Sequence, residues 1–344
     1  MMRPIQRALA APLGLALVVL LALPMAAFAN TSEAIAQTGG MTVVLPFPGT
    51  DLSVVVKLDA VGNLTQVDLA PIGTYSATKV GPHAVTFENS GDTSQVKIKA
   101  KGDKLAVSAS APTLASFLGT GSWSADLFGT GTATTVAYTV GDSGGAPTIA
   151  LGAIVPAAGI TVVPGTPKMK TGSSGSEASV RIEFSKDGFT KKLDIKVSVK
   201  ADGERPASLK ITLSGKDRQK LNGTLAQLAG LHSWSGHLCN GAPVSFTYTV
   251  RDPAGTVAFG TATGATATAK PSNHGFTVRF DGSKTKVKVS LNQKKDLSWE
   301  LKVRAKTDKC KHTPALDPKV NTPITSGADR DDEHRESDDG SSHS

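Results

Sequence analysis

A tryptophan-containing segment occurs twice in the chain, and this repeat constrains the fold more than any other feature of the sequence. Residues 114–142, LASFLGTGSWSADLFGTGTATTVAYTVGD, align with residues 225–252, LAQLAGLHSWSGHLCNGAPVSFTYTVRD, with one gap. Leu-Ala, Gly, Ser-Trp-Ser, Leu, Tyr-Thr-Val and Asp coincide. Such repetition is typical of supersecondary units that bury one face against their neighbours.

Hairpins of alternating apolar residues accompany the repeat. One begins at His83 and another at Ala178, each upstream of a tryptophan segment, and a third begins at Gly275. A weaker hairpin covers residues 43–70. Alternation with a period of two between turn residues is typical of strands with one buried face. We therefore predict an all-β fold with two domains of sandwich or partly closed barrel type, related by the internal repeat.

The N-terminus has the pattern of an export signal. Arg3 and Arg7 precede a long apolar run, and Ala27-Phe28-Ala29 forms a small-x-small cleavage site. We predict a signal peptide over 1–29 and a secreted protein that is extracellular or associated with the cell envelope. No later apolar run approaches the roughly 20 residues of a membrane-spanning helix, so no membrane span is expected.

A change of composition suggests where the domains meet. Residues 155–179 are rich in Pro, Gly and Ser, which is typical of a linker. We predict one β domain over 30–163, a linker over 164–177 and a second β domain over 178–311. A disordered acidic tail is predicted over 312–344, because the residues from Asp329 onward hold 7 acids, 2 arginines and no aliphatic side chain.

Charge separates the two halves of the chain. Residues 30–177 carry 8 Lys and Arg against 10 Asp and Glu, a net of −2. Residues 178–311 carry 24 against 11, a net of +13. The second predicted domain is therefore the basic one.

The third hairpin concentrates this charge on one face, the predicted basic ribbon. Apolar residues alternate with cations along both of its strands. The cations are Lys284, Lys286, Lys288, Lys302, Arg304 and Lys306. A turn centred on Lys294 would place Lys286 opposite Lys302 and Lys284 opposite Arg304. Like charges in opposite positions destabilise a strand pair, so the pattern indicates an anionic partner.

An exported protein meets acidic polysaccharide or envelope glycopolymer, and we predict such a polymer as the partner of the basic ribbon. A specific nucleic-acid partner is not predicted, because no aromatic residue is expected on the cationic face to stack on bases, and Trp299 is expected on the apolar side. The acidic tail is predicted to compete with the polymer. In this interpretation the protein is non-catalytic and has no cofactor, and its oligomeric state is left open.

The two cysteines of the mature chain allow two interpretations. Export favours a disulfide between Cys239 and Cys310. The alternative is a zinc or Cu(I) site, because the cysteines lie in the patterns His237-Leu-Cys239 and Cys310-Lys-His312, and residues two apart on a strand point to the same side. The spacing does not match common zinc motifs.

Two further alternatives remain open. Trp123 and Trp234 are predicted to lie in the core, although exposed tryptophans could form a carbohydrate platform. A hydrolase or hydrolase inhibitor is the other alternative, because catalytic triads depend on geometry that a sequence does not display. Its sequence support is weak: Ser- and Lys-containing fragments echo those of penicillin-binding enzymes, but they do not occur in a helical context.

Overall fold

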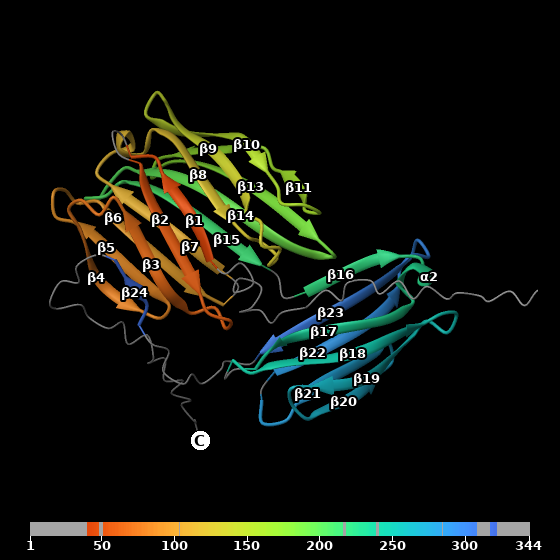
Figure 1. The fold of residues 1–344 in the computed structure, drawn as a ribbon. Coiled ribbons are helices and arrows are strands. Elements are labelled where there is room, and N and C mark those ends of the chain that lie inside the picture. The colour runs from red at the N-terminus through yellow and green to blue at the C-terminus, as the bar shows by residue number, and fades with distance from the viewer. Residues whose placement is uncertain are drawn as a thin grey trace, which may run out of the picture.

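The computed structural model describes residues 40–47, 51–102, 104–215, 218–238, 241–283, 285–307 and 317–321. Strands make up nearly all of its regular structure, so the all-β prediction is confirmed. The strands form four sheets, which enclose two separate clusters of buried apolar residues. Figure 1 shows the two parts of the fold.

The first part is a sandwich of two large sheets. One sheet has the order β10-β9-β8-β1-β2-β3-β24. Its strands are β1 (Gly40–Leu45), β2 (Leu52–Leu58), β3 (Leu64–Ala70), β8 (Gly119–Ala125), β9 (Thr134–Ser143), β10 (Ala146–Val155) and β24 (Lys319–Val320). The short 3-10 helix η1 (Leu114–Phe117) precedes β8. Alternate residues of these strands are buried, as the sequence pattern predicts.

The facing sheet has the order β11-β13-β14-β15-β7-β6-β5-β4, and β12 also pairs with β13. Its strands are β4 (Tyr75–Gly81), β5 (Ala84–Asn89), β6 (Gln95–Lys101), β7 (Lys104–Ala111), β11 (Thr161–Pro164), β12 (Lys168–Gly172), β13 (Gly175–Lys186), β14 (Phe189–Lys200) and β15 (Ala207–Gly215). Trp123 of one sheet stacks on Phe184 of the other, with ring centroids 5.9 Å apart. This stack joins the two sheets across one core.

The second part is a smaller sandwich. A five-stranded sheet has the order β16-β23-β22-β21-β20, and a three-stranded sheet has the order β17-β18-β19. The strands are β16 (Arg218–Gly223), β17 (Gly230–His237), β18 (Pro243–Arg251), β19 (Thr256–Thr263), β20 (Ala267–Ser272), β21 (Gly275–Phe280), β22 (Thr285–Gln293) and β23 (Trp299–Thr307). Helix α2 (Leu225–Leu228) precedes β17. The ring centroids of Trp234 and Phe280 lie 5.8 Å apart between the two sheets.

The division between the two cores does not fall at the predicted linker. Residues 164–177 supply the last residue of β11, all of β12 and the start of β13, and β11 and β12 both pair with β13. β15 then pairs with β7, so residues 175–215 belong to the first sandwich. A Pro- and Gly-rich segment is compatible with edge strands, which explains why its composition resembles that of a linker. The first core extends to Leu213, and the second begins at Leu228.

The predicted disorder of residues 312–344 is wrong for residues 317–321. Lys319 and Val320 form β24, which pairs in parallel with β3. The Asn321 side chain accepts a hydrogen bond from the Leu69 N–H at 2.9 Å and donates one to the Leu69 carbonyl at 3.2 Å. A two-residue strand has no periodicity that a sequence pattern could reveal. The rest of the predicted tail, and the predicted signal peptide, lie outside the described residues.

Helices are rare and short in the part of the chain that the structure describes. No helix there is long and apolar enough to cross a membrane.

Candidate functional site

The five-stranded sheet of the second sandwich has one apolar and one cationic side. On β22 and β23 the residues Val287, Val289, Leu301 and Val303 are buried against the three-stranded sheet, and the alternate positions face outward. Nine cations occupy outward positions of the five strands, and we call this set the cationic face. Its members are Arg218, Lys220, Lys270, Arg279, Lys286, Lys288, Lys302, Arg304 and Lys306.

Five of the six residues of the predicted basic ribbon belong to this face. The sixth, Lys284, lies outside the described residues. Trp299 lies on the apolar side, where its ring packs against the second core, as predicted. The cationic alternation of the hairpin was therefore a valid guide to which side chains share a face.

The predicted register of the hairpin is wrong. Lys286 lies opposite Lys306 rather than Lys302, and Lys288 lies opposite Arg304. The turn is centred on Asp296, whose carboxylate accepts hydrogen bonds from the backbone and the hydroxyl of Ser298. The pairing differs from the prediction by four residues. Because this is an even number, every side chain keeps its predicted face.

Like charges are direct neighbours in the observed register. Arg304 of β23 lies between Lys288 of β22 and Arg218 of β16. Lys286 likewise lies between Lys306 and Arg279. Side chains in opposite positions of an antiparallel pair have Cβ atoms about 5 Å apart, so each of these rows brings three positive charges close together.

Glu300 is the one acid among the outward strand positions of this face that the structure describes. Its carboxylate forms ion pairs with Lys220 and with Lys302, each at 2.6 Å. Burial raises the pKa of Glu300, but hydrogen bonds from the two lysines outweigh it and lower the pKa to about 2. Glu300 therefore compensates only one end of the face.

The row of Lys288, Arg304 and Arg218 has no such compensation among the described residues. In the described part of the chain, no ion pair is formed by Lys288, Arg304, Arg218, Arg279 or Lys270. Lys288, Arg304 and Arg218 are also exposed to solvent. These three side chains form a continuous row, and they can be approached by an anion from outside.

β16 extends the cationic face, and contacts from two turns hold it in place. The Lys220 N–H donates to the Gly188 carbonyl at 3.0 Å, and the Gln219 side chain donates to the Asp187 carbonyl at 2.9 Å. A Cβ at Gly188 would lie 2.7 Å from the Lys220 carbonyl oxygen, and its φ is +81°, so this turn requires glycine. Lys294 contacts β16 from the other turn, donating to Asn222 at 2.7 Å.

The sequence interpretation missed four members of the face. Arg218 and Lys220 lie on a six-residue strand that is far from the hairpin in sequence, and nothing in its pattern identifies its neighbour. Lys270 and Arg279 lie nearer to the hairpin in the sequence. Arg279 continues the alternation of Phe276, Val278 and Phe280, so a signal for it was present in the sequence.

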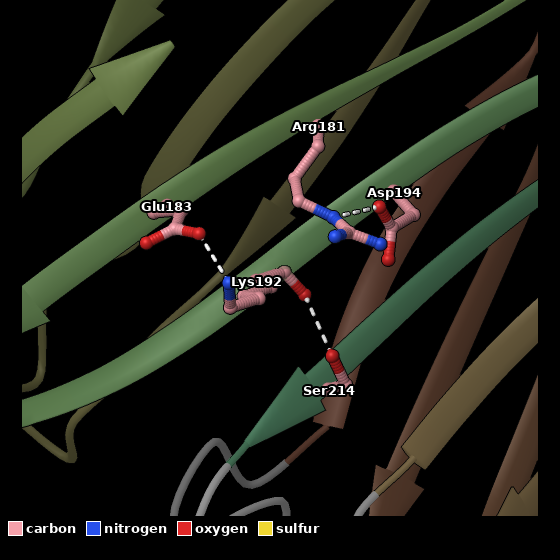
Figure 2. A network of polar contacts seen from close by, with 5 residues as sticks. All are labelled: Arg181, Glu183, Lys192, Asp194 and Ser214. Atoms are coloured by element: carbon pink, nitrogen blue, oxygen red, sulfur yellow. Dashed lines mark hydrogen bonds and ion pairs between the residues drawn. The ribbon is translucent and has the colours of Figure 1, made fainter. Parts of the chain in front are cut away.

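A contrasting arrangement occurs on the outer face of β13 and β14, shown in Figure 2. Arg181 lies opposite Asp194, with an ion pair of 2.6 Å. Glu183 lies opposite Lys192, and their side chains also form an ion pair. Lys196 pairs with Glu177 at 2.5 Å. Arg181, Lys192 and Lys196 on this face thus each have an acidic partner.

The tryptophan segments form hairpins whose aromatic residues are buried. Trp123 and Trp234 are both fully enclosed, so neither can serve as a carbohydrate platform, and the prediction that they are core residues is confirmed. His232 stacks on Tyr248 with ring centroids 5.2 Å apart, and its Nε2 lies 2.8 Å from the Leu228 carbonyl oxygen. These contacts give His232 a structural role.

The corresponding position of the first hairpin is Gly121, where the phenol of Tyr138 takes the space. A Cβ there would lie 2.4 Å from the Tyr138 hydroxyl, which donates to the Val44 carbonyl at 2.9 Å. The difference between Gly121 and His232 thus follows from how the neighbouring tyrosine packs.

The proposed cysteine chemistry is not tested. Cys239, Cys310 and His312 lie outside the described residues, whereas His237 lies at the end of β17. Among the residues that are described, no group of three or more His, Cys, Asp and Glu side chains could hold a metal ion. The disulfide and the metal site both stay predictions.

Comparison with family models, with curated proteins and with solved structures finds no match to this chain.

Proposed function

We propose that the protein is exported and non-catalytic, and that it associates with an anionic polymer through the cationic face. Acidic polysaccharide and envelope glycopolymer are the proposed partners. One observation carries the proposal: nine cations occupy one face of a single sheet whose outward strand positions supply one acid, Glu300. Rows of like charge destabilise a sheet unless counter-ions are present.

The shape of the face supports a polymer over a small anion. The cations lie on five adjacent strands, and strands in a sheet are about 4.8 Å apart, so the charges cover an area rather than converge on one point. A polymer with regularly spaced carboxylates or phosphates can contact several of them at once. Release of its condensed counter-ions then contributes to the affinity and makes it depend on salt.

Support for a nucleic-acid ligand is weaker. The outward strand positions described for this sheet hold no aromatic side chain, and Trp299 lies on the other side. Base stacking on aromatic side chains contributes a large part of the binding of single-stranded nucleic acids. A partner without bases suits this surface better.

We also propose that the internal repeat relates the two sandwiches. The support is local: Trp123 packs on Phe184 of a later hairpin, and Trp234 packs on Phe280 of the next one. In this view one scaffold occurs twice with different charges on its outer faces.

The test neutralises the uncompensated row. The mature secreted protein is titrated with alginate, a carboxylate polymer, and with inorganic polyphosphate, beside the variant Arg218→Ser/Lys288→Ser/Arg304→Ser. A cation at an anionic surface contributes about 1 kcal/mol, so the variant should bind about 100-fold more weakly. The matched control is Lys97→Ser/Lys101→Ser/Lys210→Ser, which removes the same charge from the first sandwich. If both variants lose the same affinity for the polymers, binding depends on net charge and not on the cationic face, which would contradict the proposal.

The acidic tail provides a second test. If residues 328–344 compete for the cationic face, deleting them should strengthen binding to both polymers at low salt. A tail in which the acids are replaced by Asn and Gln should behave like the deletion. Unchanged affinity after the deletion would contradict competition by the tail while leaving the polymer site itself untouched.

A further inference from the structure

One row of outward positions crosses all five strands of the sheet that carries the cationic face. Its members, from β20 to β16, are Lys270, Thr277, Lys288, Arg304 and Arg218, and we call this set the cross-strand row. All four cations of the row are exposed to solvent, and none of them forms an ion pair with another described residue. The row therefore presents accessible positive charge from one edge of the sheet to the other.

The cations of the two neighbouring rows cover fewer strands. In one of these rows they lie on β21, β22 and β23, at Arg279, Lys286 and Lys306. In the other row they lie on β23 and β16, where Lys302 and Lys220 both form ion pairs with Glu300. Among the rows described for this sheet, the cross-strand row is thus the one that has a cation on both edge strands, β20 and β16.

An anionic chain can contact more of these charges by crossing the strands than by following them. Along β23 the outward positions lead from Arg304 to Lys302, which is already paired with Glu300. Along β22 they lead from Lys288 to Ser290, which is uncharged and buried. Across the strands, the row extends over four strand spacings of about 4.8 Å, or about 19 Å. The longest continuous path for an anionic chain therefore runs perpendicular to the strands.

The twist of the sheet determines which anionic chains can follow this path. Neighbouring strands of a sheet are rotated relative to each other by about 20–25°. Side chains at the two ends of a row across five strands therefore point in directions that differ by about 80–100°. A stiff rod that contacts Lys288 and Arg304 would leave Lys270 out of reach, whereas a flexible chain can bend toward it.

We propose that the cross-strand row binds a flexible, single-chain polyanion that runs perpendicular to the strands. This inference rests on the proposed function and narrows the partner to chains that can follow a twisted surface. Arg304 and Arg218 lie side by side in the row, and the planar guanidinium group can donate two parallel hydrogen bonds to one phosphate or carboxylate group. The shared chemistry of the partner is therefore a series of such groups along a flexible backbone.

Polyphosphates of two defined lengths test the direction of the chain on the mature secreted protein. A short chain of about 10 Å reaches the three adjacent cations on β22, β23 and β16, and a long chain of about 20 Å also reaches Lys270. In Lys270→Gln, the affinity for the long chain should fall about fivefold, and the affinity for the short chain should stay the same. The matched control Lys306→Gln removes an exposed lysine of the same face that lies outside the row, and it should weaken binding of both lengths by the same factor.

Two results would overturn the proposed direction while leaving the proposed function intact. If Lys306→Gln, rather than Lys270→Gln, selectively weakens binding of the long chain, the polymer follows β23. If Lys270→Gln affects both lengths equally, the row does not guide the chain. A wild type that binds neither length would contradict the proposed function itself.

Two further polymers test the class of partner. A DNA duplex as long as the long polyphosphate is stiff, because the persistence length of DNA is about 150 bp, so its affinity should not change in Lys270→Gln. A fivefold loss with the duplex would contradict the requirement for a flexible chain. Poly-glutamate, a flexible chain of carboxylates, should show the same dependence on length as polyphosphate, and tighter binding of one of the two identifies the preferred anionic group.

Discussion

Two hairpins of this protein have the same design inside and opposite designs outside. β13–β14 and β22–β23 both bury alternate apolar residues against a facing sheet. Outward, β13–β14 places Arg181 opposite Asp194 and Glu183 opposite Lys192, whereas β22–β23 places Lys288 opposite Arg304. Because a buried face fixes the register of both hairpins, the outer face is free to vary. One hairpin uses this freedom for internal ion pairs, and the other leaves Lys288 and Arg304 without an ion pair among the described residues.

The largest expected effect is on polyphosphate binding, when glutamates replace lysines on β22 so that its outer face carries acids as β13–β14 does. In Lys286→Glu/Lys288→Glu the carboxylate at 286 lies between Lys306 and Arg279, and the carboxylate at 288 lies opposite Arg304. Four units of positive charge are lost, so binding to polyphosphate should weaken about 1000-fold at about 1 kcal/mol per charge. Isothermal titration calorimetry measures the affinity for polyphosphate. The converse variant, Glu183→Lys/Asp194→Lys, should create a weak polyphosphate site on β13–β14. If neither variant changes polyphosphate binding in the expected direction, the pairing of charges on the outer face does not determine binding.

A second prediction concerns the inner face of the charge-paired hairpin. Lys191 of β14 is buried, where it donates to the Leu127 carbonyl and lies 5.2 Å from the Phe128 ring centroid. Burial lowers its pKa to about 7 from an ordinary value of 10.5. Between these values the unfolded chain binds more protons than the folded one, so the free energy of unfolding should rise with pH, by at most about 1.4 kcal/mol per pH unit.

Urea unfolding at a series of pH values measures this dependence, with Lys191→Met as the control that lacks the ionisable group. The inner positions of β22–β23 hold no ionisable side chain, so a similar rise is not expected from that hairpin. If the wild type and Lys191→Met have parallel stability profiles between pH 7 and 10, burial of Lys191 does not control the stability in that range.

Much of this comparison could be predicted from sequence. Alternation of Val287 and Val289 with Lys286 and Lys288 identified both the strand and its cationic side. The register could not be predicted, because Asp296 and Ser298 set the turn through side-chain hydrogen bonds. The contribution of β16 was also hidden, because pairing between β16 and β23 joins residues that are far apart in sequence.

The boundary of the first sandwich was mislocated for a related reason. Composition distinguishes regular strands from loops, but edge strands tolerate Pro and Gly. Pro164 ends β11, and Gly172 ends β12, yet both strands pair with β13. Which sheet a hairpin joins depends on long-range pairing, such as that of Leu209 with Ala109, and no local pattern records it.

The smallest expected effect is on stability. Lys288→Ser removes a like-charge neighbour of Arg304 and should raise the free energy of unfolding by about 0.2–1 kcal/mol. Lys192→Ser removes the ion pair with Glu183 at the partly exposed surface and should lower it by up to about 1 kcal/mol. Urea unfolding of the two variants at low salt compares them directly. If the free energy of unfolding changes in the same direction in both variants, the charge patterns of the two hairpins do not affect stability in the proposed way.

The salt dependence of polyphosphate binding tests the central claim most directly. For the wild type, the logarithm of the association constant should fall linearly with the logarithm of salt concentration. The slope should become less steep by about two to three in Arg218→Ser/Lys288→Ser/Arg304→Ser, because each lost phosphate contact removes about one released counter-ion. Identical slopes for the two proteins would contradict the account and make the cationic face an ordinary solvated surface.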